Sequence, residues 1–341
     1  MTAPQTSRAA APVEERAAFD RLAGLLAEDL ARVDALIRER MASEHAPRIP
    51  EVTRHLVEAG GKRLRPLLCL ASARLCGYEG ASHVLLAATV EFIHTATLLH
   101  DDVVDESLRR RGRPTANLLW DNKSSVLVGD YLFARSFRLM VETGSLRVLD
   151  ILSGAAATIA EGEVMQLAMA GSLATTEAQY LTMIHGKTAA LFAAATEVGG
   201  VVAGVPEPQV EALRVYGREL GMAFQIVDDL LDYGGASAAM GKDAGDDFRE
   251  GKITMPVLLA FARGDEAARA FWRRVIEKRE QREGDLEEAV ERMRATGALA
   301  ETEARARAAV AQAVAALEAA PAGEIRDAMA GIAGFVVSRI S

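Results

Sequence analysis

The chain has 341 residues, half of them hydrophobic and only 5% aromatic, and its formal net charge is −9. This length allows a large core, and the acidic balance argues against general binding of nucleic acid. The two cysteines, Cys69 and Cys76, lie two helical turns apart in one apolar segment, which excludes a disulfide within a single helix. They predict buried thiols in a reducing compartment, and therefore a cytoplasmic protein.

The predicted elements are helices from the beginning of the chain to its end. Residues 1–15 are rich in Ala, Pro, Thr and Ser and lack the apolar stretch of a signal peptide, so they predict a disordered tail. Apolar residues then recur at helical spacing over 15–41, with breaks at 45–50 and 60–61. Further helices are expected over about 66–76, 82–106, 123–143, 146–170, 175–198, 207–233, 253–263, 265–279, 284–295, 298–319 and 323–339.

The remaining stretches indicate loops. Residues 234–251 are rich in Gly and Asp and predict a loop, and no segment alternates for long as a strand would. The best candidate for a membrane span, residues 84–99, is interrupted by Glu91 and His94, so no transmembrane helix is expected. No linker divides the chain, and the pattern predicts one all-α domain over residues 16–341.

Two short acidic motifs carry the strongest chemical signal. Asp101-Asp102-Val103-Val104-Asp105 and Asp228-Asp229-Leu230-Leu231-Asp232 both place carboxylates at positions i, i+1 and i+4. Positions i and i+4 share one helix face, and crowded carboxylates repel one another unless a cation lies between them. Hard oxygen ligands suit Mg²⁺, which takes its remaining ligands from water and substrate phosphates. One such motif could be a solvated helix face, but two with the same apolar spacers favour a site that holds a diphosphate through several metal ions.

Basic residues accompany both motifs. Lys62, Arg63 and Arg65 follow the pair Gly60-Gly61, four arginines lie within 109–113, and Lys242 and Lys252 follow the second motif. Surface ion pairs are the plain alternative. Because Arg and Lys bind phosphate directly, their pairing with the acidic motifs favours a site for two separate diphosphates.

These motifs together resemble the trans-isoprenyl diphosphate synthases, the polyprenyl synthetase family. The resemblance covers Gly-Gly-Lys-Arg-Leu-Arg-Pro at 60–66, the first aspartate motif followed by Arg-Arg-Gly at 110–112, Lys187-Thr188, Phe224-Gln225 before the second motif, Gly241-Lys242 and Glu250-Gly251-Lys252. It runs from about residue 60 to 256 and extends over nearly the whole chain. It implies the isoprenoid synthase fold, an all-α bundle around a deep central cavity, and a homodimer.

The resemblance also implies roles for single residues. The expected metal residues are Asp101, Asp105 and Asp228 as direct ligands, with Asp102, Asp229 and Asp232 in the same motifs acting through water. The expected complement is three Mg²⁺ ions bound with the allylic diphosphate. The expected substrate residues are Arg110, Lys187 and Lys252 for the allylic diphosphate, Lys242 and Gln225 for the departing diphosphate, and Lys62, Arg65, His94 and Arg111 for isopentenyl diphosphate. Thr188 and Gln225 would offer oxygen atoms to the carbocation. Gln166, in the stretch Glu163-Val164-Met165-Gln166, is a further candidate near the metals.

The implied reaction is the Mg²⁺-dependent head-to-tail condensation of isopentenyl diphosphate with geranyl, farnesyl or geranylgeranyl diphosphate. Ala96 and Thr97, one turn before Asp101, would leave the cavity wall open, with Phe133 and Phe137 as a deeper floor. The stretches 116–141 and 241–256 also resemble bacterial synthases that make octaprenyl to decaprenyl side chains of quinones. We therefore expect a long product, with peripheral membrane contact for its release.

Other functions account for the motifs less well. Gly186-Lys187-Thr188 resembles the end of a P-loop, but Leu181 stands where that motif needs glycine and the flanks are helical. A class I terpene cyclase needs no isopentenyl site, and a non-catalytic prenyl synthase subunit typically loses its acidic motifs. A medium-chain farnesyl or geranylgeranyl product remains open if Phe92 or Phe133 turns into the cavity.

Overall fold

The computed structural model describes residues 13–43, 45–58, 63–110, 112–234 and 245–340, and within them it is almost entirely helical, as predicted. The first third comprises α1 (Val13–Leu25), α2 (Ala27–Arg40), α3 (Arg48–Glu58), α4 (Leu64–Leu75) and α5 (Ser82–Val104). A hairpin of two short strands, β1 (Arg109–Arg110) and β2 (Arg113–Pro114), follows α5 and pairs Arg110 with Arg113.

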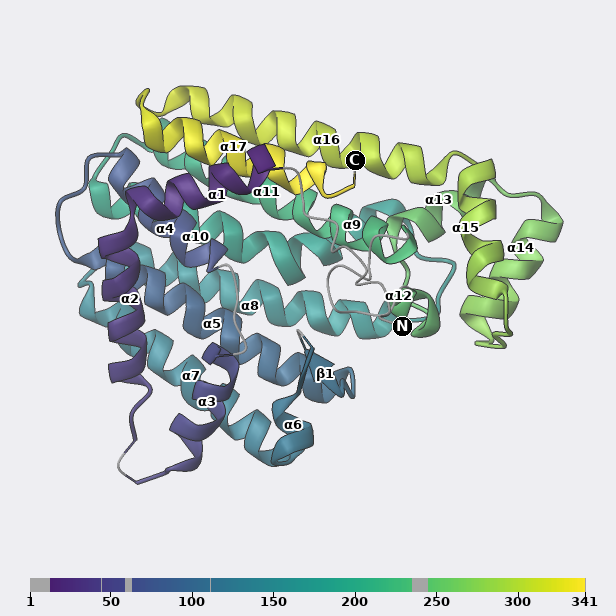
Figure 1. Cartoon of the computed structure of the whole chain (residues 1–341), viewed down its shortest axis with the longest axis horizontal. Helices are drawn as coiled ribbons and strands as arrows, with labels where there is room; N and C mark the ends of the chain where they lie inside the picture. The colour runs from purple at the N-terminus through teal and green to yellow at the C-terminus, as the bar shows by residue number, and fades with distance from the viewer. Residues whose placement is uncertain (1–12, 44, 59–62, 111, 235–244, 341) are drawn as a thin grey trace, which may run out of the picture.

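The rest of the chain continues as helices. They are α6 (Ala116–Leu119), α7 (Asn122–Glu142), α8 (Leu146–Met169), α9 (Glu177–Ile184), a π-helical turn (His185–Ala189), α10 (Ala190–Ala203), α11 (Glu207–Tyr233), α12 (Asp246–Arg249), α13 (Met255–Arg263), α14 (Glu266–Trp272), a second π-helical turn (Arg273–Glu277), α15 (Asp285–Ala295), α16 (Ala298–Ala316), a 3₁₀ turn (Leu317–Ala319) and α17 (Glu324–Ser338). Figure 1 shows α16 and α17 side by side along one edge, α14 and α15 at one end, and α2 and α3 toward the other.

The helix α10 lies at the centre of the core. It packs against α4, α5, α8 and α11, and ten of its fourteen residues are buried. A helix that is apolar on every side needs such a central position. It approaches α4 closely at Gly199, where an added Cβ would lie 2.7 Å from Cβ of Ser72. The start of α10 therefore holds the preceding π-helical turn, with Lys187 and Thr188, in a fixed place.

A buried ion pair ties the N-terminal helices to the core. Asp29 of α2 accepts hydrogen bonds from Nε and Nη2 of Arg74 on α4 at 2.7 and 2.9 Å. Nε2 of His83, at the start of α5, lies 3.0 Å from the same carboxylate. Burial alone would raise the pKa of Asp29, but these two basic partners outweigh it and lower the pKa to about 2.

The predicted helix over 15–41 is two helices. The chain bends at Leu26, because α1 packs against α17 whereas α2 packs against α5. The prediction also missed α3, whose third residue, Pro50, was taken as part of a break. Proline is tolerated in the first turn of a helix, where its missing N–H would have no partner. Most of the predicted tail, residues 1–12, lies outside the described residues.

One described helix, α5, is long and apolar enough to cross a membrane by length and composition. Most of its apolar window, 61%, is buried inside the protein, as expected of a core helix. Both cysteines are free thiols, as predicted, with Cys69 buried and Cys76 half-buried.

Candidate active site

The first acidic motif lies at the C-terminal end of α5. Asp102 is wholly buried, and its Oδ1 accepts Nε of Arg110 from β1 at 2.8 Å. Its Oδ2 is buried without a hydrogen-bond partner among the described residues. Burial raises the pKa of Asp101, and the charge of Asp105 raises it further, whereas Lys187 and Arg110 lower it. Because the C-terminus of a helix carries partial negative charge, carboxylates gathered there need positive partners.

The second acidic motif lies near the C-terminal end of α11, over its last two turns. Nη2 of Arg339, which follows α17, lies 2.8 Å from Oδ1 of Asp228. Asp229 is buried and accepts hydrogen bonds from Tyr180 and Gln225, and burial together with the charge of Asp247 raises its pKa to about 7. Asp232 accepts the backbone N–H of Asp247 at 3.0 Å and so fixes the start of α12.

The π-helical turn presents Lys187 and Thr188 between the two motifs. Nζ of Lys187 lies 2.9 Å from Oε2 of Glu163 on α8, and the hydroxyl of Thr188 donates to Oε1 of Gln225 at 2.7 Å. Gly162 of α8 and Gly186 of the turn permit this close crossing, because a Cβ at Gly162 would lie 2.6 Å from the backbone nitrogen of Lys187.

The described part of the predicted isopentenyl site lies where α4 meets α5. Nη1 of Arg65 is 3.3 Å from Nε2 of His94, and the guanidinium stacks 4.3 Å from the ring centre of Phe192. Arg63 points elsewhere, with its Nη1 bonded to Glu91 at 2.8 Å. Arg65 therefore faces His94, whereas Arg63 anchors the start of α4 to α5.

Lys252 connects the two motifs. Its Nζ lies 2.6 Å from Glu250 and 3.4 Å from Asp247. Burial alone would lower the pKa of Lys252, but the charges of Asp247, Glu250 and Asp105 outweigh it and raise the pKa. Since Asp105 belongs to the first motif and Lys252 follows the second, both motifs border one site.

The residues fit a hard divalent cation. Burial raises the pKa of Glu163, and the charges of Asp101 and Asp105 raise it further, so three carboxylates repel one another in this region. In the described ranges, no three His, Cys, Asp or Glu side chains gather closely enough to complete a metal site by themselves. Mg²⁺ suits such a sparse set of oxygen donors because it retains waters and binds substrate phosphates.

Thirteen of the sixteen predicted site residues lie within the described residues, and acids and bases that the sequence did not single out for the site, Glu163 and Arg339, lie against them. Lys62, Arg111 and Lys242 lie outside the described residues. Glu163 could have been found, because it lies three residues before Gln166, a candidate near the metals by sequence. Arg339 and Tyr180 gave no local signal, since their contacts with Asp228 and Asp229 cross long stretches of chain.

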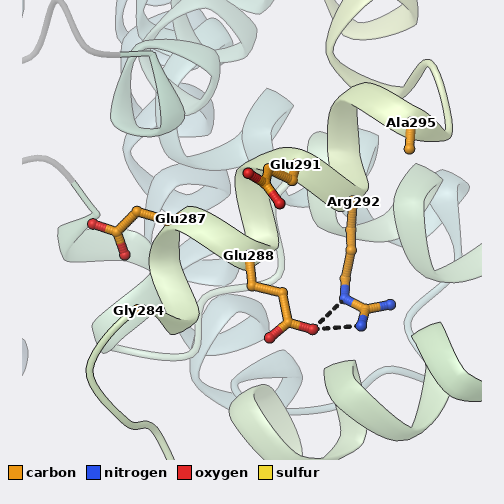
Figure 2. A pocket seen from close by; sticks show the side chains of 6 residues that line it. All are labelled: Gly284, Glu287, Glu288, Glu291, Arg292 and Ala295. Carbon is orange, nitrogen blue, oxygen red and sulfur yellow. Dashed lines mark hydrogen bonds and ion pairs between the residues drawn. The ribbon is translucent and has the colours of Figure 1, made fainter.

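A pocket of about 510 Å³ lies away from these residues, on α15. Figure 2 shows its lining, in which Nε of Arg292 donates to Glu288 at 2.9 Å. The pocket contains no residue of either aspartate motif, so we do not assign the chemistry to it.

Known proteins resemble this chain over nearly its full length. A family model described as polyprenyl synthetase matches residues 46–293. Octaprenyl diphosphate synthase of Escherichia coli (strain K12) is 44% identical over 321 residues, which are 94% of this chain and 99% of that protein. A decaprenyl diphosphate synthase from Rhodobacter capsulatus has a crystal structure with a TM-score of 0.92 and 66% identity, covering 95% of this chain and 99% of that one. The structure of a polyprenyl synthase from Caulobacter crescentus CB15, complexed with calcium and isoprenyl diphosphate, has a TM-score of 0.89 and 53% identity, covering 94% and 97%.

Proposed function

The chain belongs to the polyprenyl synthetase family, and on this premise we propose that it condenses isopentenyl diphosphate head-to-tail with an allylic diphosphate. It is a trans-prenyltransferase that builds a long-chain, all-trans polyprenyl diphosphate. The observation that carries this proposal is the similarity to octaprenyl and decaprenyl diphosphate synthases over more than nine-tenths of the chain.

We assign Mg²⁺ binding to Asp101, Asp105 and Asp228, which come from the ends of α5 and α11. The remaining acids of the two motifs are buried and accept hydrogen bonds from protein donors, which leaves them to act through water or by positioning others. Asp228 also lies against Arg339, but its side chain is 37% exposed. The bound cations would supply the positive charge that neutralises the departing diphosphate. The calcium in the related Caulobacter crescentus structure supports a divalent cation site.

The allylic diphosphate would be held by Arg110, Lys187 and Lys252. Each of these cations now pairs with a carboxylate, Arg110 with Asp102, Lys187 with Glu163 and Lys252 with Glu250. A diphosphate that enters with its metal ions can replace those carboxylates as the partner, since phosphate oxygens accept the same charge-assisted bonds. Lys242 is proposed for the same substrate from its sequence position.

Isopentenyl diphosphate would bind at Arg65 and His94, with Lys62 and Arg111 assigned from the sequence. Arg65 is held against Phe192, so its guanidinium is already oriented before substrate arrives. Because the two diphosphates bind separate basic groups, the allylic diphosphate can ionise while isopentenyl diphosphate is bound next to it.

The reaction requires no protein nucleophile. The allylic C–O bond breaks as the diphosphate leaves, and the resulting carbocation lies beside the oxygen atoms of Thr188 and Gln225. The isopentenyl double bond attacks that cation, and a proton then passes to the released diphosphate. The protein contributes position and a fixed electrostatic field.

A long product agrees with the small side chains before the first motif. Ala96 and Thr97, about one turn before Asp101, carry no aromatic ring that would stop the growing chain. The ring of Phe133, which we proposed as a deeper floor, stacks on His100 with ring centres 6.1 Å apart. Phe137, the other candidate, is 41% exposed and suits a role at the surface better. We propose a product in the octaprenyl to decaprenyl range, for a quinone side chain.

We also propose that the enzyme is a cytoplasmic homodimer that touches the membrane surface when it releases product. Neighbouring helices α7 and α8 expose large apolar side chains, among them Leu127, Phe137, Val141, Leu146 and Val164. Large apolar side chains exposed on two adjacent helices support an interface there. If a second copy covers it, Val141→Glu combined with Phe137→Glu should yield monomers by light scattering, whereas an unchanged dimer would remove α7 from the interface.

The metal assignment can be tested by Asp101→Asn and Asp228→Asn. Each variant keeps the size of the side chain but removes the charge, so turnover should be nearly abolished while the circular dichroism spectrum stays helical. Asp20→Asn, at an exposed position of α1, is the matched control and should behave as wild type. Wild-type rates in either motif variant at ordinary Mg²⁺ would contradict the assignment.

A further inference from the structure

A chain of hydrogen bonds runs from the protein interior to the residues proposed to face the carbocation. Tyr180, which is wholly buried on α9, donates its hydroxyl to Oδ2 of Asp229 at 2.6 Å. Oδ1 of Asp229 accepts Nε2 of Gln225 at 2.8 Å. Oε1 of Gln225 in turn accepts the hydroxyl of Thr188 at 2.7 Å. The chain therefore links three elements, α9, α11 and the π-helical turn.

The direction of every bond in this chain follows from its buried end. Both oxygens of Asp229 accept, one from the hydroxyl of Tyr180 and the other from the NH₂ group of Gln225. A carboxylate that accepts at both oxygens holds the amide of Gln225 with its NH₂ group turned toward it. The amide oxygen of Gln225 then faces Thr188, whose hydroxyl has to donate. The free lone pairs of Oε1 and Oγ1 are left over at the less buried end of the chain, since Gln225 is more exposed than Asp229 or Tyr180.

We propose that Asp229 and Tyr180 are positioning residues that fix the polarity of Gln225 and Thr188, so that oxygen lone pairs, and not N–H or O–H groups, face the allylic carbocation. This inference rests on the proposed function, because the benefit appears only when positive charge develops on the substrate. If Gln225 turned over, its NH₂ group and the hydroxyl proton of Thr188 would point at that charge and repel it. Fixed dipoles aimed at developing charge stabilise a transition state without reorganisation.

Tyr180 completes the arrangement by occupying the second oxygen of Asp229. With both oxygens engaged, the carboxylate cannot rotate away from Gln225, and the amide keeps its partner. The arrangement also explains why the second acid of this motif is buried at 4% exposure, whereas Asp228 next to it has a side chain that is 37% exposed.

The test compares isosteric variants in steady-state assays with isopentenyl and farnesyl diphosphates. Tyr180→Phe should lower kcat about tenfold, and Asp229→Asn about a hundredfold because an asparagine lets Gln225 turn over, both with little change in either KM. Tyr216→Phe is the matched control. It removes the hydroxyl of another wholly buried tyrosine, which donates to the carbonyl of Met329 at 2.8 Å, and should leave kcat unchanged.

A double-mutant cycle separates action through the chain from a general loss of stability. In a Gln225→Leu background, where the amide that Asp229 orients is already missing, Tyr180→Phe should lower kcat by less than about threefold. Full multiplication of the two effects would overturn the proposal. So would an Asp229→Asn variant whose only defect is a higher Mg²⁺ requirement, since that result would assign Asp229 to the metals.

Two further outcomes keep the test decisive. If Tyr180→Phe is too unstable to assay, the cycle is run with Asp229→Asn, which changes one atom and preserves the side-chain volume. If the wild-type chain itself shows no prenyl transfer, the proposed function fails. If wild type is active but the cycle is multiplicative, only the positioning role fails.

Discussion

Replacing Gly162 by alanine tests whether the crossing of α8 with the π-helical turn places the catalytic groups. The new Cβ would lie 2.6 Å from the backbone nitrogen of Lys187 and 2.9 Å from the carbonyl carbon of Gly186. To restore an ordinary contact near 3.4 Å, the two segments must separate by about 0.8 Å. Backbone atoms, unlike the end of a flexible side chain, cannot give way cheaply.

This displacement should affect both stability and turnover. Overpacking of a close helix contact costs ~1–3 kcal/mol of unfolding free energy. The hydrogen bond between Thr188 and Gln225, now 2.7 Å, would lengthen toward 3.5 Å, where little attraction remains. Misplacement of catalytic groups by about 1 Å can cost roughly a hundredfold in rate, so we expect kcat to fall by one to two orders of magnitude.

The assay pairs thermal unfolding with initial rates of isopentenyl transfer. Gly334→Ala is the control, because Gly334 is an exposed position of α17 with no atom within 4 Å of the added Cβ. It should stabilise the protein by about 0.4–1 kcal/mol and leave turnover unchanged. A Gly162→Ala enzyme with wild-type kcat would refute the reasoning, even if its melting temperature were lower, because the crossing would then serve stability alone.

Three further predictions address the substrates, the product and the scaffold. Arg65→Ala should mainly raise the KM for isopentenyl diphosphate and Arg110→Ala the KM for the allylic substrate, each about ten- to hundredfold from loss of a charge-assisted bond, and equal effects on both substrates would contradict the two-site assignment. Ala96→Phe should shorten the product to near farnesyl or geranylgeranyl diphosphate, and unchanged chain lengths would show that the product passes another helix face. Asp29→Asn should lower the free energy of unfolding at pH 7. Although burial alone would raise the pKa of Asp29, its basic neighbours lower it from 3.8 to about 2, so the difference from wild type should shrink as the pH falls from 4 toward 2, and a difference independent of pH would exclude the ion pair as its cause.

Helical periodicity was enough to predict most of the fold. The long helices α5, α7, α8, α11 and α16 have boundaries within about three residues of those expected, because each buries a continuous apolar face. The errors occurred where tertiary contacts outweigh local pattern. The expected helix over 175–198 contains the π-helical turn, which lies at the close approach of Gly162 and Gly186, and α12 forms in an expected loop because Asp232 anchors its start.

The part of the candidate site that could be predicted consists of functional residues close together in sequence. The two aspartate motifs and the basic residues beside them could be identified because carboxylates and cations at fixed spacing predict metal and phosphate binding. Residues on helices distant in sequence that contact the motif carboxylates produce no such local sequence pattern. Tyr180 is 49 residues from Asp229, and Arg339 reaches Asp228 only because α17 packs along α11.

The most direct test of the central claim is the chain length of the product. The purified full chain is given farnesyl diphosphate, an excess of isopentenyl diphosphate and Mg²⁺, and the products are dephosphorylated and separated by reversed-phase chromatography, with a chelator-treated sample beside them. We predict all-trans polyprenols of octaprenyl to decaprenyl length that disappear when the metal is removed. Products that stop at geranylgeranyl length, or no transfer with ample Mg²⁺ and both substrates, would contradict the account.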